Sequence, residues 1–364
     1  VAGRVATARN GDADGAVTGE AAAGAGPTAG RRRVLAAVLG LVGTGLVGAV
    51  TGSRGPRGAS GPVDADVAAL LDGAEAKSLD VAGMDALVSR SFYEVDINSV
   101  DPDLSPEEWS LTVTGAVEGE VEVDYGTLTA RESREEFVTL RCVGEPLNGR
   151  KMDTALWTVV DVAPLLDAAG AGEECCVMAR AADGYFEEFP RAALDDAMLA
   201  YRMNGRPLPR GHGAPVRLLV PGHWGEINVK WIDEIEVLSE PADGYWEKRG
   251  WHGTGPVNTV AKLHAENHLD DGRIEVGGHA YAGTRGIERV EVSTDGGATW
   301  TAADLSDPLP GDDVWRQWRH AYVPDGPHEV VVRAVDGTGT VQPRDRSKAF
   351  PSGATGWVSR SVEP

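Results

Sequence analysis

A single cysteine, Cys142, stands at the end of an apolar run and directly before a loop rich in glycine and proline. The stretch reads V-T-L-R-C-V-G-E-P-L-N-G over residues 138–149. The positive charge of the adjoining Arg141 favours the thiolate, which is the form that ligates metals or attacks electrophiles. A lone cysteine at a strand end is also common as a packing residue. Cys142 is therefore a candidate metal ligand or nucleophile, with a structural role as the alternative.

Cationic side chains gather a second time within residues 201–231. His212, Arg217 and Lys230 lie around a predicted strand at 216–220 and a loop bounded by glycines. Cations and loop amides that converge in this way suit a large anionic ligand carrying a phosphate. The alternative, solvated surface residues, is disfavoured because only 6 of the 34 Lys and Arg residues in this acidic chain are lysines.

The two remaining cysteines, Cys175 and Cys176, are adjacent in an apolar run, C-C-V-M-A. With three cysteines in all, the chain has no C-x-x-C motif, no c-type haem attachment motif and no zinc-ligand spacing. We therefore expect neither an iron–sulfur cluster nor a c-type haem. The apolar run predicts small buried thiols in a strand.

Short strands and helices must position these residues. Alternating or apolar runs predict strands at 109–115, 216–220 and 232–238, and a helix at 161–169 that stops at Gly170. Because no βαβ rhythm is present, these elements favour an α+β domain, which we place at residues 61–250.

The pattern changes after residue 250. Runs such as R-I-E-V-G-G-H-A-Y and H-E-V-V-V-R-A-V-D alternate with Gly, Asp and Pro turns at the spacing of a sandwich. Residues 251–364 are therefore expected to form an immunoglobulin-like β-sandwich.

Two N-terminal segments precede the globular part. Residues 1–30 have no periodicity and are expected to be a disordered lead. Within residues 31–60, three arginines precede an uncharged run at 34–53, which is about long enough to cross a membrane. A membrane anchor and a twin-arginine export signal both fit, and both place the folded part on the extracytoplasmic face of the membrane. A buried core helix is the third alternative.

The overall charge excludes several classes of partner. The chain has 56 Asp and Glu against 34 Lys and Arg, a net charge of −22, and 42% hydrophobic residues in 364. The hydrophobic content excludes wholesale disorder, and an acidic surface repels nucleic acid and anionic lipid. Few lysines and many carboxylates are also typical of proteins from halophiles.

Several longer motifs give the chain a resemblance to the sulfite oxidase family, from about Phe92 to the C-terminus. In the order seen in that family, the sequence carries T-L-R-C (139–142), A-L-W-T (155–158), A-x-D-G-Y (181–185), L-A-Y-R-M-N-G-x-P-L-P (199–209), H-G-A-P-V-R-L-L-V-P-G (212–222), V-K-W (229–231) and V-S-T-D-G-G-A-T-W (292–300). The resemblance implies a mixed α+β domain that binds a molybdenum–molybdopterin cofactor, followed by an immunoglobulin-like dimerisation domain.

The resemblance also assigns roles by position. Cys142 would be the thiolate ligand of molybdenum, for which a soft sulfur is suited. Tyr201 resembles the tyrosine beside the molybdenum oxo group, although a core tyrosine is the alternative. The groups that would hold the pterin and its phosphate are Tyr93, Glu94, His212, Arg217, Asn228, Val229 and Lys230.

The sequence departs from the family at the expected anion pocket. Where family members carry arginines just after the cysteine, this chain has E-P-L at 145–147. Arg90 is a candidate catalytic replacement, and Arg141 and Arg150 are further candidates. Oxidation of sulfite to sulfate is the first hypothesis for the activity. Reduction of S-oxides or N-oxides remains open, because a related bacterial methionine sulfoxide reductase also lacks that pocket.

The resemblance further implies partners. Because the chain has no haem or flavin motif, the electrons would pass to a separate carrier, a cytochrome or a membrane-bound redox protein. The β-sandwich would form a homodimer. A hypothesis of another class is a non-catalytic surface binding protein that uses the β-sandwich to recognise its partner.

Overall fold

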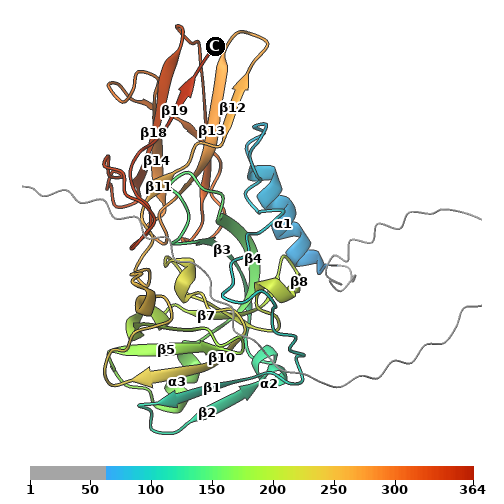
Figure 1. Ribbon diagram of the computed structural model, residues 1–364. Helices are drawn as coiled ribbons and strands as arrows, with labels where there is room; N and C mark the ends of the chain where they lie inside the picture. The colour runs from blue at the N-terminus through green and yellow to red at the C-terminus, as the bar shows by residue number, and fades with distance from the viewer. Residues whose placement is uncertain (1–62) are drawn as a thin grey trace, which may run out of the picture. The chain divides into compact units, whose positions relative to one another are not determined.

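Strands outnumber helices in residues 63–364, the part of the chain that the computed structural model describes (Figure 1). Its α-helices are α1 (Ala65–Lys77), α2 (Tyr125–Thr129) and α3 (Ala163–Ala169). The predicted α+β mixture is thus correct only in outline, since the described chain is mostly β. The predictions for residues 1–30 and 34–53 lie outside the described residues. Between residues 63 and 364, no helix is both long and apolar enough to span a membrane.

One five-stranded sheet has the order β2-β1-β10-β5-β6, in which only the β1–β10 pair is parallel. Its strands are β1 (Ser110–Gly115), β2 (Val121–Asp124), β5 (Cys176–Ala181), β6 (Phe186–Pro190) and β10 (Ile232–Leu238). Leu165 and Leu166 of α3 belong to the same buried core as the apolar side chains of these strands. Gly170 ends α3 at φ 66°, the left-handed conformation that glycine adopts most readily. These elements confirm the strands predicted at 109–115 and 232–238 and the helix predicted at 161–169.

A second sheet carries or adjoins several of the candidate site residues. It has the order β3-β4-β7-β8, with β9 also paired to β7, and every pair is antiparallel. The strands are β3 (Arg134–Arg141), β4 (Met152–Asp161), β7 (Met198–Met203), β8 (Arg206–Pro207) and β9 (Arg217–Leu219). Arg217, at the start of β9, pairs with Ala200, which pairs with Val159, whereas Arg141 at the end of β3 pairs with Met152. Cys142, which follows β3, and Arg217 therefore lie at different levels along the strands of one sheet.

Two antiparallel sheets follow in the C-terminal part, in the upper half of Figure 1. One contains β11 (Val260–Ala261), β12 (Ala265–His268), β13 (Ile274–Tyr281), β16 (Asp304–Leu305) and β17 (Arg316–Tyr322). The other contains β14 (Ile287–Ser293), β15 (Thr301–Ala302), β18 (His328–Asp336) and β19 (Val358–Val362). Val276 and Trp318 of the first sheet share one buried core with Val290 and Val332 of the second. The alternating pattern after residue 250 therefore predicted paired sheets correctly.

Four short 3-10 helices complete the elements of the described chain. They are η1 (Arg191–Leu194), η2 (Arg210–His212), η3 (Gly225–Ile227) and η4 (Glu247–Arg249). Two of them, η2 and η3, contribute residues to the site. A buried core shared by Phe137, Trp224, Tyr281 and Trp315 joins the second sheet to the C-terminal sheets. The part of the chain that contains the first two sheets and the C-terminal part are thus packed together through apolar side chains.

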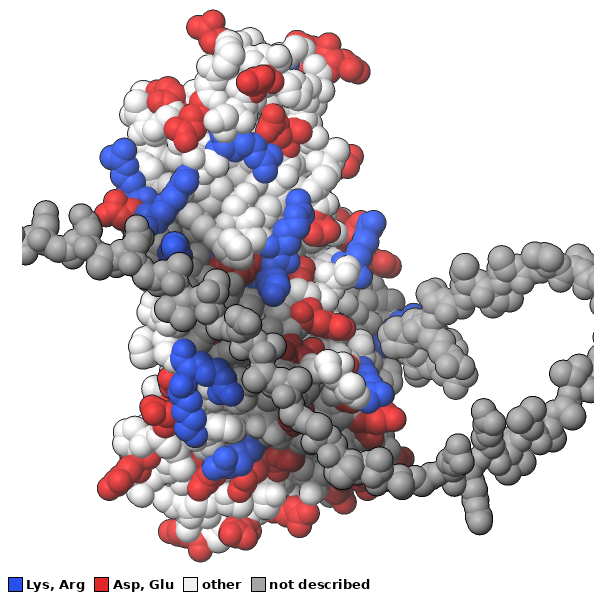
Figure 2. Space-filling model, in the orientation of Figure 1, with Lys and Arg blue, Asp and Glu red and all other residues white. Residues whose placement is uncertain are grey.

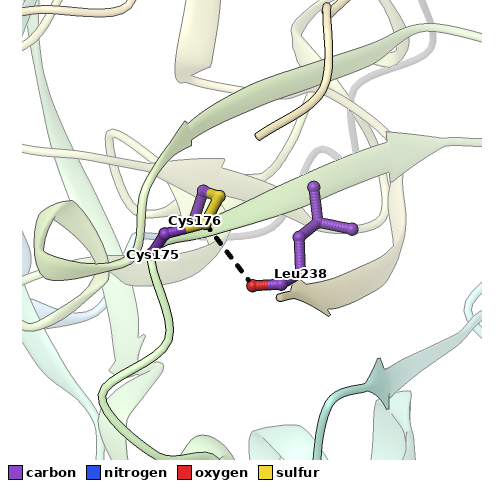
Figure 3. The surroundings of a disulfide bond; sticks show 3 residues. All are labelled: Cys175, Cys176 and Leu238. Atoms are coloured by element: carbon purple, nitrogen blue, oxygen red, sulfur yellow. Dashed lines mark hydrogen bonds between the residues drawn. A yellow bond between two sulfur atoms is a disulfide. The ribbon is translucent and has the colours of Figure 1, made fainter. Parts of the chain in front are cut away.

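The prediction of two free buried thiols at residues 175 and 176 is wrong. Cys175 and Cys176 form a disulfide between adjacent residues, and Cys175 Sγ lies 3.7 Å from the carbonyl oxygen of Leu238 (Figure 3). Cys176 begins β5 and is buried as expected, whereas Cys175 precedes the strand and is exposed. Only one of the two cysteines belongs to the strand, so the prediction from the apolar run that both are buried is correct for Cys176 alone.

The surface bears out the acidic composition. Figure 2 shows acidic side chains spread over the face in view, with Lys and Arg in a few separate groups. Of the cations discussed below, Arg141, Arg217 and Lys262 are buried, whereas Lys151 is exposed.

Candidate active site

A cavity of about 230 Å³ lies where the second sheet meets the loops around residues 92–97 and 223–231. It brings together most of the residues singled out in the sequence: Tyr93, Cys142, His212, Arg217, Asn228, Val229 and Lys230. They come from four separate stretches of chain. The cavity is therefore a product of the fold, and local sequence alone could not show it.

Cys142 is a free thiol in the wall of this cavity. It directly follows β3, and its backbone N–H donates to the carbonyl oxygen of Lys151, 3.0 Å away, which continues the β3–β4 pairing by one residue. Burial raises the pKa of the Cys142 thiol, while the Gly144 backbone and the Lys151 ammonium act in the opposite direction. A soft sulfur ligand is thus held at a fixed position and faces the cavity.

Arg141 does not activate this thiol, which corrects the expectation from the sequence. Its guanidinium is fully buried, and Nε donates to Glu145 Oε1 at 2.8 Å. The terminal nitrogens donate to the carbonyl oxygens of Asn258 and Ala354, in the C-terminal part of the chain. Successive side chains of a strand point to opposite faces, so Arg141 and Cys142 face different surroundings. Arg141 therefore anchors the C-terminal part and is not a cavity cation.

Arg217 is the most deeply buried cation of the cavity. Its side chain donates to the carbonyl oxygens of His212 (3.3 Å) and Asn228 (2.9 Å), and Nε is buried without a partner. Among residues 63–364 no carboxylate forms an ion pair with it. Burial lowers the pKa of Arg217 to about 10. An unpaired buried guanidinium needs an anion, which the described residues do not supply.

Asn228 and Lys230 lie beside Arg217 in the cavity wall. The Asn228 amide accepts from the Val220 N–H at 2.8 Å and donates to the Trp224 carbonyl at 2.9 Å, so it fixes the loop between them. Lys230 Nζ donates to the Gly211 carbonyl at 2.8 Å and pairs with the Asp96 carboxylate. Asp96 was not foreseen, because it lies in a loop with no recognisable pattern.

His212 is kept neutral at physiological pH by its position. Burial and the charges of Arg217 and Lys230 lower the pKa of His212 to about 4. Glu94 lies 3.5 Å from His212 Nε2, but Glu94 is exposed and does not line the cavity. A neutral imidazole can donate one hydrogen bond and accept another, which suits a polar ligand more than a phosphate alone.

Tyr93 is held in the cavity wall by its backbone. Its N–H donates to Asp153 Oδ2 at 2.8 Å, and Asp153 Oδ1 accepts from the Ser89 hydroxyl at 2.7 Å. Asp153 belongs to β4, so these two bonds fix the 89–93 loop on the second sheet. The phenol of Tyr93 and the ring of Phe92 are stacked, with centroids 5.5 Å apart.

Two predicted catalytic residues are not brought to the cavity. Arg90 is exposed, and its guanidinium lies 3.1 Å from Glu75 of α1. Tyr201 is buried in the core of the first sheet, where its ring meets Tyr125 edge-on at 6.3 Å. Arg150 is also absent from the cavity lining. In each case the chain position was close to the site, but the side chain points elsewhere.

Other residues line the cavity without having been predicted. Lys151 reaches it from the start of β4, and Trp246 and Trp251 reach it from the segment that follows β10. Glu226 also faces it, and burial together with the charge of Glu247 raises the pKa of Glu226 to about 8. The tryptophans were detectable as an aromatic cluster near residue 250, but only the fold shows that they face the cavity.

The donor set fits a molybdenum–molybdopterin group by its chemistry. A free sulfur ligand and an unpaired buried guanidinium open onto one cavity, as a metal–dithiolene centre with a phosphate tail requires. The orphaned Nε of Arg217 is the observation that most directly points to an anionic group.

Comparison with known proteins agrees with this fit. Residues 98–246 match the family described as "Oxidoreductase molybdopterin binding domain", and residues 256–354 match "Mo-co oxidoreductase dimerisation domain". Mitochondrial sulfite oxidase of Rattus norvegicus is 30% identical over 301 residues, which cover 66% of this chain and 54% of that protein. The enzyme of Homo sapiens is 30% identical over 303 residues, with the same shares. The chain thus spans about half the length of these curated relatives.

One solved structure shows the same fold. The sulfane dehydrogenase SoxCD from Paracoccus pantotrophus superimposes with a TM-score of 0.63, over 73% of this chain and 78% of that one. At 22% identity, this likeness speaks to the fold alone.

Proposed function

Because this chain belongs to the sulfite oxidase family of molybdopterin-dependent oxidoreductases, we propose that it oxidises sulfite to sulfate and passes two electrons to a separate acceptor. The observation that carries the proposal is the free thiol of Cys142 facing the same cavity as the unpaired guanidinium of Arg217. The first marks the metal end of the cofactor site and the second its anionic end.

Within this site the residues divide by chemistry. Cys142 is the proposed thiolate ligand of molybdenum. Arg217 and Lys230 would neutralise the phosphate, and His212 would hydrogen-bond a polar part of the pterin. Asn228 and Val229 would contribute indirectly, because the Asn228 side chain sets the loop whose carbonyl oxygen holds Arg217. Tyr93 would close the cavity from the 89–93 loop.

The proposed reaction converts sulfite and water into sulfate, two protons and two electrons. When bound, the cofactor supplies two-electron redox chemistry and exchange of an oxygen atom that comes from water. Lys151 lines the same cavity as Cys142, and its charge opposes the rise in the pKa of that thiol. Lys151, and not Arg90, is therefore the proposed attraction for the sulfite dianion.

Further parts of the assignment are proposals that rest on sequence pattern. Residues 61–250 would form the cofactor-binding domain, and residues 251–364 an immunoglobulin-like domain that pairs two copies of the chain. The uncharged run at 34–53 supports export or anchoring, with the folded part on the extracytoplasmic face of the membrane. A cytochrome or a membrane redox protein would then accept the electrons.

A turnover assay tests the proposal. Protein produced in a host that makes the cofactor is mixed with sulfite and an artificial one-electron acceptor, and acceptor reduction and sulfate are measured together. We expect two equivalents of acceptor reduced for each sulfate formed. Cofactor-loaded protein that leaves sulfite unchanged but oxidises a reduced electron donor when given an S-oxide would contradict the proposed substrate and direction.

A further inference from the structure

Three glutamates from separate segments meet beside the cavity. Glu187 belongs to β6, Glu226 to η3 and Glu247 to η4, and one carboxylate oxygen of each lies within 4.8 Å of those of the other two. They are about 40 and 20 residues apart in sequence, so the fold alone brings them together. Glu226 also lines the cavity, but Glu187 and Glu247 do not.

No positive charge among the described residues compensates this cluster. None of the three glutamates forms an ion pair with a Lys, Arg or His of residues 63–364. Glu187 Oε2 accepts from the Tyr185 hydroxyl at 3.0 Å and the Trp246 N–H at 3.3 Å. The remaining five carboxylate oxygens of the cluster are buried with no hydrogen-bond partner.

The carboxylate of Glu226 is buried within the cluster and lacks hydrogen-bond partners. Its side chain is only 7% exposed, and both carboxylate oxygens are without a partner. Two glycines let the backbone come close to the cluster: a Cβ at Gly244 would collide with Glu187 Oε1, and one at Gly253 with Glu226 Oε2. The oxygens are thus enclosed on these sides by backbone and aimed at one another, and not at solvent.

Such an arrangement is costly unless a cation or bound protons neutralise the carboxylates. Buried polar atoms without partners are unfavourable, and three carboxylates this close repel one another. All donors are oxygen, which selects hard cations such as Ca²⁺ and Mg²⁺. Three oxygens that all lie within 4.8 Å of one another are close enough to contact a single ion at about 2.0–2.6 Å, the range of Mg²⁺ and Ca²⁺. We infer that Glu187, Glu226 and Glu247 bind a hard divalent cation, for which Ca²⁺ is the probe used below.

A bound cation would stabilise the position of one wall of the cavity. Glu247 lies in the segment that connects β10 to β11, and the same segment contributes Trp246 and Trp251 to the cavity lining. Glu187 and Glu226 belong to the other side, on β6 and η3. A bound ion would therefore join the connecting segment to the cofactor-side part and keep the two tryptophans in place.

Calorimetry and thermal unfolding of the full, cofactor-loaded chain test the inference without any activity assay. After EDTA treatment and desalting, titration with CaCl₂ is expected to show one Ca²⁺ per chain and a rise in melting temperature of about 3 °C or more at saturation. The Ca²⁺ should also slow proteolysis within residues 239–255. Glu226→Gln and Glu247→Gln should abolish the shift, whereas Glu240→Gln, an exposed glutamate of the same segment, should keep it.

Two results would overturn the inference. One is a folded wild-type chain that shows neither heat of Ca²⁺ binding nor a change in melting temperature with Ca²⁺ or Mg²⁺. The other is a Ca²⁺ response that survives unchanged in both cluster variants. In the first case, if Glu247→Gln raises the melting temperature in EDTA, the three carboxyl groups share protons instead. Sulfite turnover enters none of these readouts, so the cation site and the proposed function fail separately.

Discussion

Arg217 is the residue whose surroundings most clearly suit a bound anion, because its buried guanidinium has no partner at Nε. We predict that Arg217→Met lowers the molybdenum and pterin content of the purified chain at least about tenfold, because it removes the one buried unpaired guanidinium that faces the cavity among residues 63–364. Arg217→Lys should retain part of the content, because it keeps the charge but not the planar fork. Metal analysis and pterin fluorescence measure both.

The matched control is Arg202→Met, which removes an exposed arginine from the neighbouring strand β7. Equal cofactor content in Arg217→Met and Arg202→Met, with both chains folded by circular dichroism, would show that Arg217 does not hold the anionic end.

Lys151 is the residue on which we predict that sulfite binding depends. Loss of a charge-assisted contact to a dianion costs about 1–3 kcal/mol, so Lys151→Met is expected to raise the KM for sulfite by roughly 5- to 150-fold. Lys151→Arg should keep the KM for sulfite close to the wild-type value. Arg150→Met, which removes the neighbouring cation outside the cavity lining, should change this KM little. Steady-state kinetics give the answer, and an unchanged KM in Lys151→Met would refute this role.

At the scale of elements, the 89–93 loop is fastened to β4 through Asp153. Burial raises the pKa of Asp153 to about 6, even though hydrogen bonds from Ser89 and Tyr93 act against the rise. A carboxyl whose pKa is higher in the folded state contributes stability that is full below its unfolded pKa and is lost as pH rises through the folded value. Stability from Asp153 should therefore fall as pH increases through about 4 to 6.

Asp153→Asn tests this, because an amide keeps the size and does not titrate. From about pH 4.5 to about pH 7.5, the free energy of unfolding of the wild type should fall by roughly 2 kcal/mol relative to the variant. Urea unfolding at the two pH values measures the difference. A constant difference across this range would mean that Asp153 does not bind a proton in the folded state at these pH values.

A buried charge network joins the loop after Cys142 to β11. Lys262 Nζ pairs with Glu145 and donates to the Gly149 carbonyl at 3.0 Å, and Glu145 also pairs with Arg141. Both Lys262 and Glu145 are essentially unexposed. Removing one partner of a buried pair is strongly destabilising, so Lys262→Met should lower the free energy of unfolding by about 3 kcal/mol. Urea unfolding of Lys262→Met is compared with that of Lys348→Met, which removes an exposed lysine. Equal decreases in the free energy of unfolding in the two variants would contradict the prediction.

The elements also show what sequence can and cannot predict. The helix at 163–169 and the strands at 110–115, 217–219 and 232–238 follow from local periodicity, and Gly170 marks a stop that depends on backbone conformation alone. The direction of a side chain does not follow so simply. Arg141 and Tyr201 lie in the expected segments but face the C-terminal part and a core, because partners distant in sequence decide this.

For the whole molecule, the charge distribution fits the proposed chemistry. The chain carries a net charge of −22, and Figure 2 shows carboxylates over the face in view, yet the buried Arg217 and the partly buried Lys230 line one cavity. A small anionic substrate is repelled by the surface and attracted only at the site, so salt should increase its rate of association by screening the surface. The composition indicated the acidic surface, but only packing shows where the cations are concentrated.

Electron paramagnetic resonance of the cofactor-loaded chain, before and after anaerobic addition of sulfite, tests the central claim most directly. We predict a pentavalent molybdenum signal that appears with sulfite and whose parameters change in Cys142→Ser, because the sulfur ligand is replaced by oxygen. Molybdenum present at one per chain with no signal on addition of sulfite would contradict sulfite oxidation. A signal identical in Cys142→Ser would contradict the assignment of Cys142 as the ligand.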